Sequence, residues 1–236
     1  MITTPRSELI AGIRAEIPIT LGVLPFGLIY GVLAVSAGLP PSLAIASSSI
    51  VFAGSAQFIG AQLIGASAPG LVIWLTTFIV NLRHLLYSTS LAPGTRHLSR
   101  PWKWFLAYLL TDEAYVVTAL HYQDDKIPLR HKHWFWVGAG LTLWVTWQLS
   151  TTAGVFFGTQ LPSSWSLDFT LALTFIGMVV PLCRQRPNLA AALTAGLVAV
   201  FTFGWPYRLG LMTAAIAGIA AGIIVENYQR KKERGA

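Results

Sequence analysis

Residues 17–82 read IPITLGVLPFGLIYGVLAVSAGLPPSLAIASSSIVFAGSAQFIGAQLIGASAPGLVIWLTTFIVNL, and these 66 residues include no Asp, Glu, Lys, Arg or His. As one continuous helix they would extend roughly 100 Å at about 1.5 Å per residue, against a hydrocarbon core about 30 Å thick. In lipid, such a stretch satisfies its backbone polar groups only as membrane-crossing helices. The stretch therefore predicts about three crossings rather than a large soluble core.

The composition of the whole chain agrees with a membrane protein. Of 236 residues, 54% are hydrophobic and only 11% are charged, whereas roughly a quarter are charged in a typical soluble domain. The net charge of +7 could indicate nucleic-acid binding, but the basic residues lie in short hydrophilic breaks and at the C-terminus. We therefore expect no nucleic-acid partner. Cys183 has no second cysteine for a disulfide or a cysteine-based metal site, and we expect neither a metal nor a cofactor.

Proline, glycine and charge divide the chain into eight candidate spans. They cover about residues 17–38, 42–65, 70–91, 104–120, 134–157, 166–182, 188–204 and 209–225. The fourth is the weakest because it carries Asp112 and Glu113; a re-entrant segment there would leave seven crossings. The expected fold class is an all-α, polytopic transmembrane bundle of about eight spans, with broken or kinked helices.

The distribution of Lys and Arg predicts the orientation. Eight spans put both termini on one side, and a cytoplasmic assignment of that side places 11 basic residues inside and four outside. The basic segment at 96–103 does not fit this bias, because the assignment places it outside. We expect a cytoplasmic segment over 1–16, a transporter domain over 17–226 and a basic cytoplasmic tail over 227–236, in a bacterial inner membrane.

Two features of the charge-free stretch could bind a substrate. Pro25-Phe26-Gly27 lies near the middle of the first span and predicts a kink or break, whose exposed backbone dipoles could hold a carboxylate or an ammonium group. In the second span, Ser48, Ser55 and Gln62 are spaced by seven, which predicts one polar helix face. The alternative for both is close helix packing, since small residues and proline are common in membrane helices.

Ionisable residues form a third feature. Only about thirteen residues precede Arg83 after Pro69-Gly70, so Arg83 and His84 are expected inside the apolar zone. A central Arg costs about 2.5–3.5 kcal/mol on insertion scales and should therefore have a partner. Asp112 and Glu113 of the next segment are the carboxylates expected at similar depth. We expect Asp112 to pair with Arg83, and a coupling site and a purely structural ion pair both remain open.

The same residues carry a family resemblance. The stretches are Pro25-Phe-Gly-Leu-Ile-Tyr-Gly31, Phe52-Ala-Gly-Ser-Ala-Gln-Phe58, Asn81-Leu-Arg-His-Leu-Leu-Tyr-Ser88 and Thr111-Asp-Glu-Ala-Tyr115. In this order they resemble the AzlC family, the large subunit of two-component exporters of branched-chain amino acids. The resemblance covers most of the chain, is densest between residues 12 and 120, and is weaker in the C-terminal half.

The resemblance implies an exporter of L-valine and similar amino acids, acting with a small AzlD-type membrane subunit. The chain has no Gly-x-x-x-x-Gly-Lys-Ser/Thr loop, so we expect a secondary transporter, coupled to protons. The expected substrate-binding residues are Pro25, Phe26, Gly27, Ser48, Gly54, Ser55, Gln57, Gln62 and Asn81, and the expected coupling residues are Arg83, His84, Asp112 and Glu113. An exporter of another small solute and a non-transporting assembly subunit are the alternatives.

Enzyme activity is not expected. Ser55 and His84 could suggest an intramembrane serine protease, but the sequence supplies none of the usual context for a catalytic serine. His131 and His133 lie in a polar segment without cysteine or a second histidine pair, so they do not indicate a metal-dependent enzyme.

Overall fold

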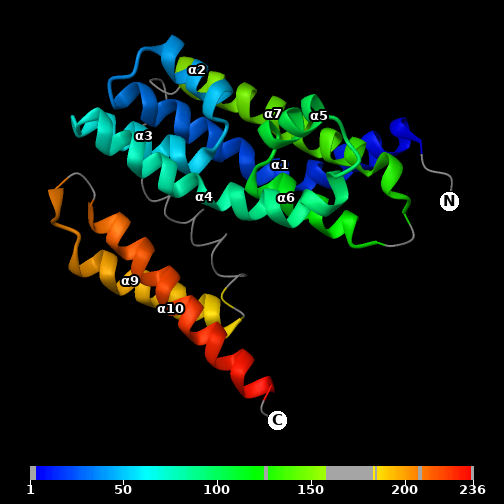
Figure 1. The fold of residues 1–236 in the computed structure, drawn as a ribbon. Coiled ribbons are helices and arrows are strands. Elements are labelled where there is room, and N and C mark those ends of the chain that lie inside the picture. Colours follow the sequence, from blue (N-terminus) through cyan, green and yellow to red (C-terminus); the bar gives the residue numbers. More distant parts are fainter. Residues whose placement is uncertain (1–3, 125–126, 158–182, 184, 207–208, 235–236) are drawn as a thin grey trace. The chain divides into compact units, whose positions relative to one another are not determined.

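A computed structural model describes residues 4–124, 127–157, 183, 185–206 and 209–234. The chain divides into two compact units, Met1–Pro162 and Ser163–Ala236. The described helices of the first unit are α1 (Pro5–Ser36), α2 (Pro41–Val51), α3 (Gly54–Gly65), α4 (Gly70–Thr95), α5 (Arg100–Tyr108), α6 (Asp112–Tyr122) and α7 (Leu129–Phe157), and those of the second are α9 (Arg186–Phe201) and α10 (Leu209–Arg234) (Figure 1). All regular structure in the described residues is helical, as the sequence predicts.

Helices α1 and α7 form the centre of the first unit and lie side by side (Figure 1). Their backbones approach closely through glycine: a Cβ at Gly31 would collide with the Thr151 carbonyl oxygen, and one at Gly154 would collide with the Leu28 carbonyl oxygen. Small residues allow this kind of packing between membrane helices. Helix α1 continues through Pro25 without interruption, so the helix is not broken at Pro25-Phe26-Gly27, and the alternative of a kink there stays a prediction.

The second expected span, 42–65, is broken instead. Helix α2 ends at Val51, Phe52 adopts a left-handed conformation (φ 42°, ψ 44°), Ala53 is extended, and α3 begins at Gly54. The predicted polar face is therefore wrong for Ser48, because a seven-residue spacing keeps side chains on one face only along an uninterrupted helix, whereas Ser55 and Gln62 keep that spacing within α3. Serine 48 belongs to α2, whereas the other two belong to α3.

The fourth expected span, 104–120, is also two helices. Helix α5 has 9 residues and α6 has 11, so each extends only about 14–17 Å at about 1.5 Å per residue. Neither crosses a 30 Å hydrocarbon core on its own. Thr111 caps α6 by accepting a hydrogen bond from the Ala114 amide at 3.3 Å.

Some of the described helices have the length and composition of membrane-spanning helices. Three described helices are long and apolar enough to cross a bilayer, namely Pro5–Ser36, Gly70–Thr95 and Leu209–Lys231, and the apolar helices Pro41–Val51 and Arg186–Phe201 are shorter. Along α4, large apolar side chains are exposed while only Thr76 and Leu91 are buried. Exposed apolar surface of this extent is typical of contact with lipid or a partner. The span expected at 166–182 lies outside the described residues.

The second unit contains a pair of packed helices. Gly218 of α10 faces Ala191 and Ala195 of α9, and Gly222 faces Ala191 one turn away. These small residues let the two helices approach closely. The two helices correspond to the expected seventh and eighth spans.

Candidate functional site

An ionic network joins α3, α4 and α6. The Arg83 guanidinium of α4 donates from Nη2 to the Ser55 Oγ of α3 at 2.5 Å, and its Nη1 lies 3.0 Å from the Asp112 Oδ2 of α6. The Tyr87 hydroxyl donates to the other Asp112 oxygen, Oδ1, at 2.8 Å. The predicted Arg83–Asp112 ion pair is thus confirmed. Its side chains are 29% and 37% exposed, so the pair lies at the edge of the protein interior.

The ends of two short helices shape this network. Ser55 lies in the first turn of α3, and Asp112 and Glu113 begin α6. The positive end of a helix dipole favours negative charge in the first turn, which suits both carboxylates. Tyr87 stacks on Tyr115 with ring centroids 4.3 Å apart, and the His84 ring lies edge-on to Tyr87. The break between α5 and α6 therefore creates a helix N-terminus at the two carboxylates, which one continuous helix would not provide.

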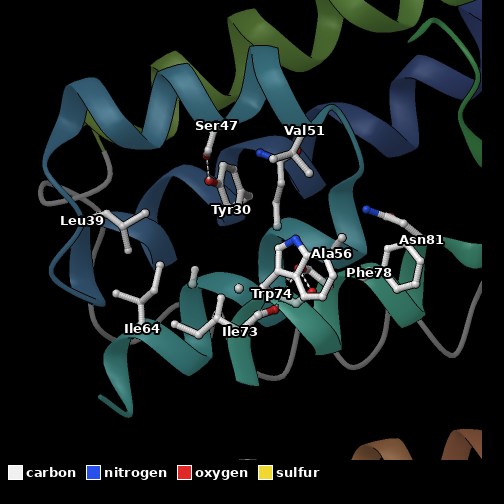
Figure 2. A pocket seen from close by; sticks show the side chains of 14 residues that line it. Tyr30, Leu39, Ser47, Val51, Ala56, Ile64, Ile73, Trp74, Phe78 and Asn81 are labelled. Atoms are coloured by element: carbon white, nitrogen blue, oxygen red, sulfur yellow. Dashed lines mark hydrogen bonds between the residues drawn. The ribbon is translucent and has the colours of Figure 1, made fainter. Parts of the chain in front are cut away.

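A pocket of about 410 Å³ lies next to this network in the first unit, within the size range of small-molecule sites. It is formed by residues of α1, α2, α3 and α4 and of the connection after α1, as Figure 2 shows. Its lining residues are Tyr30, Leu39, Ser47, Val51, Ala56, Gln57, Gly60, Ala61, Ile64, Ile73, Trp74, Thr77, Phe78 and Asn81. The wall is mostly apolar with a few hydroxyl and amide groups.

Two amide groups of the pocket wall have unused hydrogen-bonding capacity. The Gln57 Oε1 accepts from the Trp147 indole at 3.1 Å, but its buried Nε2 has no partner among the described residues. The buried Asn81 Oδ1 also lacks one there. The four-residue connection from α3 to α4 makes the two helices antiparallel neighbours, so Gln57 and Asn81 lie at the pocket end away from that connection. In Figure 2, Leu39 and Ile64 lie at the opposite end from Asn81.

The remaining predicted substrate residues are mainly helix contacts. Ser48 donates to the Thr151 hydroxyl of α7 at 3.0 Å, which ties α2 to α7. Phe26 stacks on Phe58 at 4.6 Å, and a Cβ at Gly54 would lie 3.0 Å from the Phe26 ring. These residues, like Pro25, Gly27 and Gln62, do not line the pocket. Of the nine predicted substrate residues, the pocket brings together Gln57 and Asn81.

Several residues of the site were missed by the sequence analysis. Tyr30 and Ser47 line the pocket with hydroxyl oxygens 2.5 Å apart, and Thr77 lines it from α4. Tyr87 could have been found, because it lies four residues after Arg83 and so shares its helix face. Glu16 was assigned to the cytoplasmic segment, but its side chain is fully buried. No group of three or more potential metal ligands occurs among the described residues.

Comparison with known proteins assigns the chain to a family. The model of the AzlC protein family matches residues 18–161. The inner membrane protein YgaZ of Escherichia coli is 25% identical over 92% of this chain and 89% of its own. The branched-chain amino acid transport protein AzlC of Bacillus subtilis is 29% identical over 80% of this chain and 75% of its own. No solved structure matches significantly. The family match includes the pocket and the ionic network, and the chain therefore belongs to the AzlC family.

Proposed function

We propose that this chain is the large membrane subunit of a secondary transporter that exports branched-chain amino acids such as L-valine. The observation that carries the proposal is the pocket of about 410 Å³, which has an amide-bearing end and an aliphatic end. Family membership and the name of the Bacillus subtilis relative support the substrate class. The Escherichia coli relative is named an inner membrane protein, which supports a bacterial inner-membrane location.

The pocket chemistry is complementary to a zwitterion with a branched apolar tail. An amide group supplies both N–H donors and a carbonyl acceptor, so the Gln57 amide suits a substrate carboxylate and the Asn81 carbonyl suits an ammonium group. Both atoms lack partners among the described residues, and a buried polar atom left unpaired is costly until a ligand pairs with it. Leu39, Ile64 and Ile73 line the other end and would bury the aliphatic tail.

The broken second span gives the pocket its architecture. Residues from the C-terminal end of α2 and the N-terminal half of α3 both line it. Discontinuous helices at substrate sites are a recurring feature of secondary transporters, because their ends expose backbone dipoles. Gln148 and Tyr108 donate to the Ser48 and Ser49 carbonyl oxygens near the end of α2. These contacts supply hydrogen-bond donors to two α2 carbonyls beside the break.

We propose that transport is coupled to protons and that Arg83, His84, Asp112 and Glu113 take part in coupling. The Arg83 guanidinium binds Ser55 on α3 and Asp112 on α6, and Asn81 lies two residues before it on the pocket wall. Rearrangement of the pocket on substrate binding would therefore act directly on the ion pair. The required partner is a small AzlD-type membrane subunit, as the family resemblance implies.

Flux of labelled valine in vesicles tests the proposal. Vesicles containing this chain and the small partner should move valine when a pH gradient is imposed, and vesicles with either subunit missing should not. Transport of a different small solute in place of valine would favour the exporter alternative. Full valine transport by the folded chain without the partner would refute the two-component assignment, and no transport of any solute would indicate an assembly subunit.

A further inference from the structure

The Glu16 carboxylate is an unusual buried group. Its residue is 0% exposed, and both carboxylate oxygens lack a hydrogen-bond partner among the described residues. An isolated ionised carboxylate in an apolar interior is far more costly than its neutral, protonated form. Glu16 is not part of the ionic network of Arg83, and none of the roles proposed above involves it.

The register of α1 against α6 places Glu16 opposite Glu113. Near the start of α1, Glu8 pairs with His121 of α6, with the His121 Nε2 and the Glu8 Oε2 2.6 Å apart. Glu16 lies eight residues after Glu8, and Glu113 lies eight residues before His121. Antiparallel helices joined at Glu8–His121 therefore bring the two glutamates to the same level. Glu113 indeed interacts electrostatically with Glu16.

Among the described residues, Glu113 is the charged group that acts on the Glu16 carboxylate, and no cation is found acting on it. Helices α2 and α3 contain no ionisable residue, and those of α7 are confined to residues 130–133 in its first turn. Contacts of Gly12 with α7 at Phe135 and Ala139 and of Gly27 with Ser150 place Glu16 beyond that turn. The Glu113 side chain accepts from Thr111 and interacts with Asp112 and Arg83. Glu16 itself faces a second carboxylate rather than a cation.

We propose that Glu16, together with Glu113, is the proton-binding site of this protein, with the proton carried on Glu16. A metal cation is less suited to this position, because hard cations take about six to eight oxygen ligands and the carbonyls of continuous helices are already hydrogen-bonded. Binding requires one step: a Glu16 carboxylate oxygen takes one proton to form the carboxyl group, and release restores the carboxylate.

The use of this site for coupling rests on the proposed transport function. Asp112 and Glu113 are adjacent at the start of α6, so one short helix carries both the partner of Arg83 and the neighbour of Glu16. A shift of α6 that follows substrate binding would change the distance between the two glutamates. A closer Glu113 carboxylate favours the protonated Glu16, and a more distant one favours proton release.

Infrared difference spectroscopy of the full chain in lipid nanodiscs tests the proton site without any transport. A pH titration should show the C=O stretch of a protonated carboxyl group, and that band should be lost in Glu16→Gln. Glu226→Gln, which changes an exposed glutamate paired with Arg230, should retain it. Glu113→Gln should shift the pH at which the band disappears. A spectrum that is the same in wild type and folded Glu16→Gln would overturn the proposal.

Valine flux in vesicles with the small partner then tests coupling. Glutamine resembles a permanently protonated glutamate, so Glu16→Gln should lose valine export driven by a pH gradient and keep exchange of internal for external valine. Retention of gradient-driven export by Glu16→Gln would overturn the coupling role. A carboxyl band that depends on Glu16, in a protein that moves no valine, would uphold the proton site and refute the proposed function instead.

Discussion

The Arg83–Asp112 ion pair allows a double-mutant test of what holds α4 to α6. The changes are Arg83→Leu, Asp112→Leu and the double variant. Each single change leaves one charge behind: Asp112 keeps the Tyr87 hydroxyl, and Arg83 keeps Ser55. A charge left unpaired in the apolar zone is costly, so each single variant should be less stable than wild type, and the double variant should recover part of the loss.

The structure bounds the magnitude. At 3.0 Å, two unit charges attract each other by about 5.5 kcal/mol at an effective dielectric constant of about 20, before the cost of desolvation is subtracted. Exposed pairs retain about 0.2–1 kcal/mol, and breaking a fully buried pair costs about 3–5 kcal/mol. The side chains are 29% and 37% exposed. We therefore expect an interaction energy between these limits, of about 1–3 kcal/mol.

Unfolding of the purified variants in mixed micelles, followed by tryptophan fluorescence, measures this energy. Additive effects of the two single changes would refute the reasoning, because independent sites show no interaction energy. Asp112→Asn separates stability from coupling, since the amide keeps the shape and removes the charge. If Asp112 couples transport to protons, this variant should fold and lose export driven by a pH gradient. Normal valine export by Asp112→Asn would remove Asp112 from the coupling mechanism.

Three further predictions concern the pocket, the helix packing and the orientation. Gln57→Ala should weaken the apparent affinity for valine by about 2- to 13-fold, which corresponds to one neutral hydrogen bond of about 0.5–1.5 kcal/mol. Gln62→Ala, which changes a residue outside the pocket, is the control. Equal effects of the two changes would contradict the proposed binding site. Gly154→Ala should cost about 1–3 kcal/mol of stability by overpacking against the Leu28 carbonyl. Gly22→Ala, in the interior of α1 with open space around it, should lose no stability, because alanine is the better helix former. Thermal unfolding compares the two variants. A C-terminal reporter should be active in the cytoplasm, and activity only in the periplasm would reverse the predicted topology.

The sequence determined the class of protein and the identity of the ion pair. A stretch as long as residues 17–82 without charge has few stable forms outside a bilayer, so the membrane class follows from composition. Charged residues are scarce in the apolar segments that follow this stretch. A charge in an apolar environment is costly unless it is paired. Arg83 and Asp112 were predicted as a pair for that reason, and the structure confirms the contact.

The position of the helix break depended on tertiary packing. The sequence favoured Pro25, because proline removes a backbone hydrogen bond. Yet α1 continues there, and membrane helices tolerate proline where neighbouring helices support the backbone. The break occurs instead at Phe52, a residue type with no turn preference of its own. It is held by Gln148 of α7 and Tyr108 of α5, which donate to carbonyls of α2 from positions far away in the sequence.

The buried glutamate was hidden from the sequence for the same reason. Glu16 stands at the border of the charge-free stretch, where a charged residue usually marks the end of a membrane span. Its burial depends on the packing of α1 against α7, and its position near Glu113 depends on α6, which the Glu8–His121 contact joins to α1 across 113 residues of sequence. Local patterns record which side chains are apolar or charged, but the environment of a side chain depends on the neighbours that distant segments bring to it.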